Sequence, residues 1–330
     1  MDSPHTYANE RNAWNRCRHI PGSVEGHYES YFQRANHPQR PLAFWIRYTV
    51  FSPKGNPGEA VGELWAIYFD GELDQITAVK ETFPMESCRF SSKNLDVRIG
   101  DALLNESYLV GQVSTGSNTL LWDLQYAGPQ PPLLLLPQSF YERGFPKAKA
   151  MVGFPNATFD GAMMVNGENI RIDHWKGSQN HNWGEKHTDS YAWGQVAGFD
   201  NEPDAFLECS TARIRLGPVW SPPLTFVVLR TAGNEIRLNS LSQSFRARGK
   251  FDVSSWRINS GNSRVRIIIH IHAPKSAFVG LVYNNPPGGT KNCLNTKLAT
   301  CELTLEQRGE PERTLIAKQR AAFEILSDHI

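Results

Sequence analysis

The sequence predicts an all-β protein built from two antiparallel β-barrel or β-sandwich units in tandem. Short runs of alternating apolar and polar residues, bounded by Pro, Gly and Asn, recur from residue 27 onward. Helix-like periodicity is rare by comparison. The two halves also share one rhythm of strands, and two such units account for a length of 330 residues.

Five runs in the first half have the alternation of antiparallel strands. They cover residues 28–35, 42–51, 62–70, 108–113 and 118–126. In the second of these runs, Trp45, Arg47 and Thr49 share one face, and aromatic and aliphatic residues share the other. Both faces are bulky, as expected of a wall between a filled interior and a covered exterior.

Three other segments of the first half lack the alternation of these strands or contain a turn signal. Residues 128–138 combine four Pro with a run of Leu, which excludes a central strand and indicates a crossover or an interdomain strap. Asn166-Gly167 is the strongest short turn signal of the chain and predicts a hairpin over residues 161–172. Residues 1–20 are polar, and we expect a loose N-terminal arm that Trp14 could anchor.

The second half repeats the pattern. Its runs cover residues 224–230, 235–241, 263–273, 277–283 and 297–307. Three pairs of segments resemble each other, namely 43–69 with 191–214, 118–126 with 264–273, and 157–165 with 297–305. We therefore expect an arm at 1–20, a first β domain at 21–168 and a second at 169–330. Residues 317–329 are the best helix candidate, although they could equally form a strand.

Composition excludes several classes of partner. The net charge is +1 and charged residues make up 20%, so no nucleic-acid or anionic membrane surface is indicated. No window approaches the ~20 apolar residues that span a bilayer, and the polar N-terminus is unlike a signal peptide. Nine Trp and 11% aromatic residues suit an apolar or stacking pocket. Oligomeric state stays open.

The five cysteines have neither a CxxC motif nor zinc-ribbon spacing. An odd and sparse set favours free thiols in a reducing compartment, so we expect a cytoplasmic protein. Cys293 and Cys301 are close enough in sequence to pair, and the sequence leaves that alternative open.

Residues 173–201 are unlike the rest of the chain, since they interleave polar residues with two Trp-Gly steps. The segments His181-Asn182-Trp183-Gly184 and 191–195 (YAWGQ) resemble the lipocalin-like superfamily of hydroxyneurosporene synthase, a carotenoid hydratase, and tocopherol cyclase. The resemblance extends from about residue 22 onward. It implies two lipocalin-like β units with an enclosed pocket for a hydrophobic small molecule.

The resemblance also implies a reaction class. Relatives of this kind protonate isolated alkenes, so the chain would be a hydratase, cyclase or isomerase of an isoprenoid- or polyketide-like substrate, with no cofactor. Such chemistry needs a buried acid and π-faces that stabilise a carbocation. The main alternative is a carrier that holds a lipophilic molecule in the same barrel without converting it. A carbohydrate-binding module, with Trp rings as sugar platforms, is a third hypothesis.

The candidate site residues follow from that chemistry. The acid is His181 with Glu208, or failing that Asp123, which lies inside an apolar strand and would need pairing or protonation if buried. Glu208 stands where the family pattern has Asp, and Phe206 where it has an aromatic with a hydroxyl. The substrate-binding wall comprises Trp183, Tyr191, Trp193, Gln195, Arg47 and Trp45.

We expect no metal. His270 and His272 share one strand face, and His174, His181 and His187 are close in sequence, but none joins an acid at a recognisable ligand spacing. Arg47 could bind a carboxylate or phosphate group, or form a salt bridge within the barrel.

Overall fold

The structure is a computed structural model that describes residues 7–327. Strands make up 63% and helices 8%, so the all-β prediction is confirmed. Within the described residues, the chain forms two compact units. Unit 1 comprises residues 7–134, 147–187 and 284–289, and unit 2 comprises 135–146, 188–283 and 290–327.

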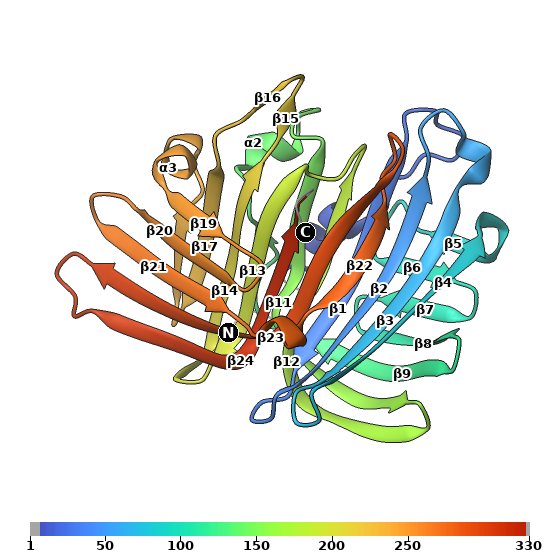
Figure 1. The fold of residues 1–330 in the computed structure, drawn as a ribbon, viewed down its shortest axis with the longest axis horizontal. Coiled ribbons are helices and arrows are strands. Elements are labelled where there is room, and N and C mark those ends of the chain that lie inside the picture. The colour runs from blue at the N-terminus through green and yellow to red at the C-terminus, as the bar shows by residue number, and fades with distance from the viewer. Residues whose placement is uncertain (1–6, 328–330) are drawn as a thin grey trace. The chain divides into compact units, whose positions relative to one another are not determined.

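Unit 1 is built on one twelve-stranded antiparallel sheet. Its strand order is β4-β3-β2-β1-β12-β11-β9-β8-β7-β6-β5, with β10 paired to β11 (Figure 1). The elements are α1 (Ala8–Asn15), β1 (His27–Asn36), β2 (Leu42–Ser52), η1 (Pro57–Glu59), β3 (Val61–Asp70), β4 (Gln75–Pro84), η2 (Met85–Ser87), β5 (Cys88–Phe90), β6 (Asp96–Ile99), β7 (Ala102–Asn105), β8 (Tyr108–Thr115), β9 (Asn118–Ala127), β10 (Leu133–Leu134), β11 (Ala148–Val165) and β12 (Glu168–Gly184).

The sheet of unit 1 nearly closes on itself. Strand β4 meets strand β8 through two hydrogen bonds. The backbone N–H of Lys80 donates to the Thr115 hydroxyl at 3.3 Å, and that hydroxyl donates to the Lys80 carbonyl at 2.6 Å. Alternate residues of β1 and β2, such as Tyr31, Ala35 and Tyr48, point into the enclosed apolar core. Side chains of the opposite parity face outward.

Unit 2 is built on a ten-stranded antiparallel sheet of order β18-β17-β14-β13-β24-β23-β21-β20-β19, with β22 paired to β23. The elements are α2 (Gln138–Tyr141), β13 (Ser190–Phe199), β14 (Glu202–Arg213), β15 (Arg215–Leu216), β16 (Val219–Trp220), β17 (Leu224–Thr231), β18 (Asn234–Leu238), α3 (Leu241–Arg246), β19 (Arg248–Phe251), β20 (Ser255–Gly261), β21 (Val265–His272), η3 (Lys275–Ala277), β22 (Val279–Asn284), β23 (Thr290–Gln307) and β24 (Arg313–Leu326).

The two strand orders match from β4 to β7 and from β18 to β19, as expected of a repeat, while β6 and β5 have no counterpart in unit 2. They place β9 with β21 and β11 with β23, which agrees with the sequence pairs 118–126/264–273 and 157–165/297–305. The third sequence pair, 43–69 with 191–214, matches β2 to β13 and is therefore wrong by one strand. In the structure β13 occupies the position of β1. Neighbouring aromatic strands of one sheet look alike in sequence, which explains the shift.

The expected boundary between residues 168 and 169 moves to between 187 and 188. The Asn166-Gly167 hairpin forms as predicted and joins β11 to β12 (Figure 1). Strand β12 then pairs with β1 over nine positions, so its hydrogen bonds hold it in unit 1. Residues 181–184 therefore end unit 1, while residues 191–195 belong to the first strand of unit 2.

Of the two alternatives open for residues 317–329, the strand is the one that forms. Strand β24 ends at Leu326, and its alternate side chains, such as Phe323 and Ile325, enter the core of unit 2, while residues 328 and 329 lie outside the described part of the chain. The proline-rich segment crosses between the units as expected, since the chain enters unit 2 at Leu135 and returns to unit 1 at Lys147, and Leu133–Leu134 form the short strand β10.

The described part of the N-terminal arm, residues 7–20, is anchored and not loose. Helix α1 carries buried Arg11 and Asn15. Asn15 Nδ2 donates to Gln179 Oε1 at 2.9 Å. The Arg11 guanidinium donates to the carbonyls of Gly153, Gly128 and Gln130 and lies 4.1 Å over the Phe154 ring. Polar side chains thus fasten the arm to unit 1.

Replacing Arg11 by alanine is expected to lower the free energy of unfolding by about 2–4 kcal/mol, because three carbonyls lose a charged donor. Arg16 is the matched control, since it lies on the same segment and is exposed. Urea denaturation of both variants checks this. Equal stabilities would show that the arm contributes nothing to the fold.

Candidate functional site

The buried pair His181 and Glu29 lies at the centre of unit 1. His181 Nε2 and Glu29 Oε1 are 2.8 Å apart, and neither side chain is exposed. His181 Nδ1 lies 3.1 Å from the carbonyl oxygen of Trp14. A carbonyl and a carboxylate are both acceptors, so both ring nitrogens must carry a proton to satisfy these contacts. The geometry therefore favours an imidazolium–carboxylate pair.

Strand register brings the pair together. Tyr31 on β1 stands opposite His181 on β12, and Glu29 stands opposite Trp183. Alternate residues of a strand share a face, so Glu29 and Tyr31 point the same way, into the barrel of unit 1. Sequence reasoning placed His181 in the site but missed Glu29, which is 152 residues away.

Glu29 accepts an unusual number of hydrogen bonds. Its Oε2 accepts from the backbone N–H groups of Arg18 and His19 at 2.7 Å and 3.0 Å, and from His27 Nε2 at 2.9 Å. The Cys17 thiol donates to the same oxygen at 3.3 Å. Charge-assisted bonds of this kind stabilise the ionised carboxylate.

The protonation states follow from these contacts. Burial by itself raises the pKa of Glu29, but hydrogen bonds from His181 and His27 outweigh it and hold the pKa below its ordinary value. Burial lowers the pKa of His181 below its ordinary value and outweighs the opposing hydrogen bond and charge of Glu29. When both ring nitrogens carry a proton, as the contacts favour, the surroundings promote loss of one of them. Such a group is a stronger acid than an exposed histidine.

Aromatic rings flank the acid. The phenol of Tyr31 stacks on the imidazole of His181 with ring centroids 4.2 Å apart. The indole of Trp183 lies 4.7 Å from the same imidazole, and the Arg18 guanidinium lies 3.8 Å over the Trp183 ring. Burial raises the pKa of Tyr31, so its hydroxyl stays a neutral donor to Glu29 Oε1 at 3.2 Å.

The segment from Trp14 to His19 covers the pair. Arg18 Nη1 donates to the carbonyls of Trp14 and Arg16, both at 2.9 Å, which fixes the segment's turn. The cluster comes closest to solvent at two side chains, since Arg18 is 21% exposed and His27 is 18% exposed. Trp183, beneath Arg18, is 7% exposed.

Unit 2 carries a separate buried polar group on β13 and β14. Glu208 Oε1 accepts from Trp193 Nε1 at 2.7 Å, and Glu208 Oε2 accepts from Gln195 Nε2 at 2.8 Å. These side chains lie on the face opposite to the core of unit 2, because Ala192 and Val196 of the other parity enter that core. Tyr191 has the same parity as Trp193.

An ion pair adjoins that group. Lys297, fully buried on β23, donates to Asn295 Oδ1 at 2.5 Å and to Glu324 Oε1 at 2.9 Å. Its ammonium lies 5.6 Å from the Trp193 ring centroid. Glu208 and His181 thus belong to different units, each with its own partners. Nothing in the residue types of β23 singled out Lys297 beforehand.

A family model described as Tocopherol cyclase-like matches residues 147–325, more than half of the chain. The chain belongs to the tocopherol cyclase-like family. The match includes His181, Trp183 and Glu208, whereas Glu29 lies outside it.

Curated relatives of this family member are two Mycobacterium tuberculosis proteins, Rv0493c and MT0513, both described as uncharacterised. Each is 23% identical over 86% of this chain and 82% of its own length. Among solved structures, a Nitrosomonas europaea protein given the name AttH has a TM-score of 0.57 and 13% identity, covering 94% of this chain and 99% of its own.

Two other solved structures share the fold. Kievitone hydratase from Nectria haematococca has a TM-score of 0.56 and 12% identity over 93% of this chain and 90% of its own. CghA, solved with Sch210972, has the same TM-score and identity and covers 94% of each chain. Identities this low establish the lipocalin-like fold of the tocopherol cyclase-like family and no more.

Other residues singled out in the sequence lie apart from His181. Arg47 and Trp45 occupy the outward face of β2, where Arg47 Nη2 donates to Ser30 Oγ at 2.6 Å. Trp45 meets Trp65 edge-on, with ring centroids 6.4 Å apart. Both side chains are nonetheless buried.

The expectation that Asp123 is a buried acid is wrong. Asp123 is exposed, because β9 turns the opposite parity, including Trp122, into the core. It lines a surface groove of about 470 Å³ together with Ser107, Tyr108 and Gln125.

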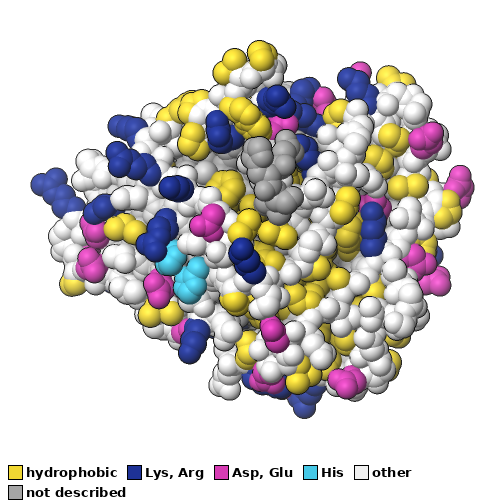
Figure 2. Space-filling model, viewed as in Figure 1, with side chains coloured by type: hydrophobic (Ala, Val, Ile, Leu, Met, Phe, Trp, Pro, Cys, Tyr) yellow, Lys and Arg dark blue, Asp and Glu magenta, His cyan; other side chains and the backbone are white. Residues whose placement is uncertain are grey.

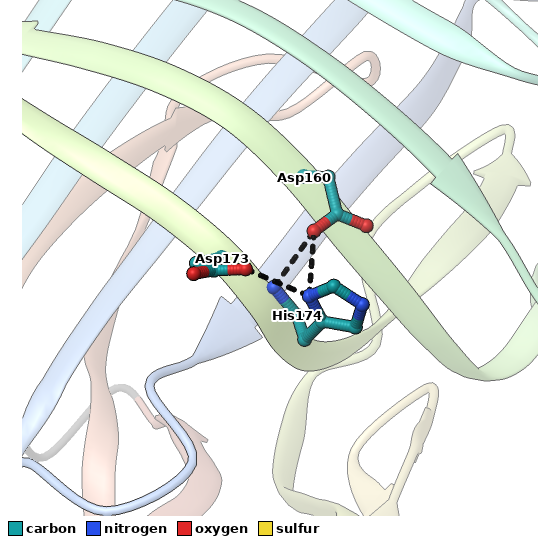
Figure 3. Close-up of side chains that lie close together, drawn as sticks. All are labelled: Asp160, Asp173 and His174. Carbon is teal, nitrogen blue, oxygen red and sulfur yellow. Dashed lines mark hydrogen bonds and ion pairs between the residues drawn. The ribbon is translucent and has the colours of Figure 1, made fainter.

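Within residues 7–327, one group of three side chains has the spacing of metal ligands, namely Asp160, Asp173 and His174. Figure 3 shows His174 Nδ1 between the two carboxylates, at 2.8 Å from Asp173 and 3.1 Å from Asp160. Asp160 also accepts from the backbone N–H of His174 at 2.8 Å, so it stabilises the bulge where His174 has φ 55°. A structural role accounts for this exposed group.

Figure 2 shows basic, acidic and hydrophobic side chains interspersed over the face in view. No helix in the described part of the chain is long and apolar enough to cross a membrane. All five cysteines are free, and Cys293 and Cys301 lie roughly 25 Å apart along one strand.

Proposed function

We propose that this chain is a cofactor-independent hydratase, cyclase or isomerase of an apolar, isoprenoid- or polyketide-like small molecule. The observation that carries the proposal is the His181–Glu29 pair, a fully buried imidazole and carboxylate flanked by the rings of Tyr31 and Trp183. Membership of the tocopherol cyclase-like family supports it. So does a fold shared with a protein named as a hydratase.

The proposed reaction begins with transfer of a proton from a His181 ring nitrogen to an alkene. The π electrons form the new C–H bond, and the N–H electrons stay on the imidazole. The other alkene carbon becomes a carbocation. A water molecule then adds and loses one proton in hydration, whereas a hydroxyl or alkene of the substrate adds in cyclisation. Loss of a different proton gives isomerisation.

Trp183 is the proposed cation-stabilising ring. Its face already binds a cation, since the Arg18 guanidinium lies 3.8 Å over it. A carbocation at the same place would gain about 2 kcal/mol from a desolvated ring. Tyr31 offers a second ring on the other side of the imidazole. In this arrangement Glu29 holds the imidazolium in place and keeps it charged.

Substrate access requires Arg18 to move. Its two hydrogen bonds to backbone carbonyls, its cation–π contact and its 3.8 Å ion pair with Glu29 are each worth about 1 kcal/mol. Burial of an apolar substrate supplies about 25 cal/mol per Å², so a molecule that buries about 160 Å² offsets the displacement. The partly exposed Arg18 thus marks the proposed point of entry.

Glu208 remains the alternative acid, with Trp193, Tyr191 and Gln195 as its proposed substrate-binding neighbours. We further propose a reducing, cytoplasmic compartment, which suits five free thiols. The variants His181→Gln and Glu208→Gln distinguish the two candidate acids. In each, the new amide can still form hydrogen bonds but has no acidic proton to give. The one that collapses turnover identifies the donor.

Mass spectrometry tests the proposal. The protein is purified under mild conditions, its bound small molecules are identified, and a panel of terpenoid and polyketide alkenes is incubated with it in H₂¹⁸O. We expect conversion of at least one alkene, with ¹⁸O in the product of a hydratase or an isomeric mass for a cyclase. A retained lipophilic ligand that is never converted would instead identify a carrier.

A further inference from the structure

Glu29 joins two histidines that differ in their access to water. Its Oε1 faces His181 Nε2 at 2.8 Å, and its Oε2 faces His27 Nε2 at 2.9 Å. The His181 side chain is fully buried, whereas that of His27 is 18% exposed. The three side chains form an unbroken hydrogen-bonded line from the interior of unit 1 to its surface.

A proton can pass along this line without leaving an isolated charge. Once His181 has given up its Nε2 proton, His27 passes its own Nε2 proton to Glu29 Oε2. The carboxylic acid so formed turns about its Cγ–Cδ bond, passes that proton to His181 Nε2 and becomes a carboxylate again, and His27 takes a proton from water at Nδ1. The carboxylate can link the two rings because each of its oxygens is hydrogen-bonded to one histidine. Tyr31 also donates to Oε1, and the Cys17 thiol and two backbone N–H groups also donate to Oε2. The exposed ring then exchanges with water to restore its starting tautomer.

The surroundings of the line are well defined. His181 is next to Arg18, Tyr31 and Trp183 besides Glu29, and the Cys17 thiol donates to Glu29 Oε2. His27 faces His19, with ring centroids 5.7 Å apart, and burial followed by the charge of His27 lowers the pKa of His19. No other imidazole within residues 7–327 is hydrogen-bonded to Glu29, so His27 is the exit from the buried pair.

We propose that His27 and Glu29 form a proton relay that returns a proton to His181 after each turnover. This inference rests on the proposed function, in which His181 loses a proton to the substrate. His27 is then a positioning residue that never touches the substrate. The relay predicts that His181 exchanges its ring protons with water through His27, with or without substrate.

Exchange measured by ¹⁵N NMR on histidine-labelled, full-length protein tests the relay. His27→Gln keeps an N–H donor to Glu29 but cannot pass a proton, and we expect exchange of the His181 ring protons to slow by ~10²-fold. His19→Gln is the matched control and should leave exchange unchanged. Unchanged exchange in folded His27→Gln would overturn the relay.

A second variant guards against an indirect effect. His27→Ala should show the same slow exchange, and added imidazole should restore it by filling the vacated space. The proposal would also be overturned by a combination of two results. These are slow exchange in His27→Ala that imidazole cannot restore, and normal exchange in His27→Gln. Since no substrate is needed, a protein without turnover but with relay-dependent exchange would contradict the proposed function alone.

Discussion

Replacing His181 by glutamine is expected to lower turnover by a factor of ~10² to 10⁴, the usual loss when a general acid is removed. The amide can still donate to Glu29 but has no acidic proton to give. Ligand affinity should change little, because the side chain keeps its approximate size and a donor. Steady-state kinetics with the substrate found in the panel, together with calorimetric binding, checks both expectations.

Trp183→Phe is the matched control for that variant. A benzene face survives, so we expect less than a tenfold loss, against the nearly thirtyfold loss that complete removal of a ring worth about 2 kcal/mol would cause. If both variants turn over substrate like the parent, the acid is not in unit 1. Glu208 would then be the next candidate.

Replacing Glu29 by glutamine is expected to lower the free energy of unfolding by about 3–5 kcal/mol. The substitution leaves the buried His181 cation without its counter-charge. It also turns an amide N–H towards groups that donate to Glu29 Oε2, including the Arg18 and His19 backbone. Chemical denaturation followed by fluorescence measures the loss.

Two controls accompany Glu29→Gln. Glu72 pairs with Arg40 on the surface, so Glu72→Gln should change stability very little. The double variant Glu29→Gln/His181→Gln should lose less than the sum of the single variants, because the second change removes the uncompensated charge. Additive losses would mean that the two side chains do not interact.

The same pair predicts how stability depends on pH. The pKa of Glu29 is lower in the folded state than in the unfolded chain, so the unfolded state binds the proton more tightly. The stabilisation by Glu29 is complete above the unfolded pKa of about 4.3 and is lost as pH falls towards the folded pKa. Thermal melts below pH 4.5 should therefore converge for the parent and Glu29→Gln.

Local patterns predicted the fold well because strands in a barrel wall alternate between core and exterior. The runs at 42–51 and 118–126 became β2 and β9 with little change. Local patterns could not choose between helix and strand for residues 317–329, because Ala and charged residues there are compatible with a helix, and pairing with the distant strand β23 decides for extended structure. Helix α1 was missed because its buried faces are polar, as with Arg11.

The site was predicted only in part, because its second half depends on pairing between distant strands. His181 and Trp183 carry a rare local motif, whereas Glu29 is one acid among 33 acidic residues. One signal was available in the sequence. His27, Glu29 and Tyr31 alternate along one face of β1, so Glu29 lies on the same face as core residues such as Tyr31. The prediction of a buried Asp123 was wrong because a strand with mostly apolar residues can still expose alternate side chains to water.

The most direct test of an acid in unit 1 follows solvent deuterium through one turnover. When the parent converts its substrate in D₂O, we expect one non-exchangeable deuterium on a product carbon, and we expect His181→Gln to incorporate almost none in the same time. A product whose carbons carry no deuterium from the parent enzyme, or equal incorporation by His181→Gln, would contradict proton delivery by the His181–Glu29 pair.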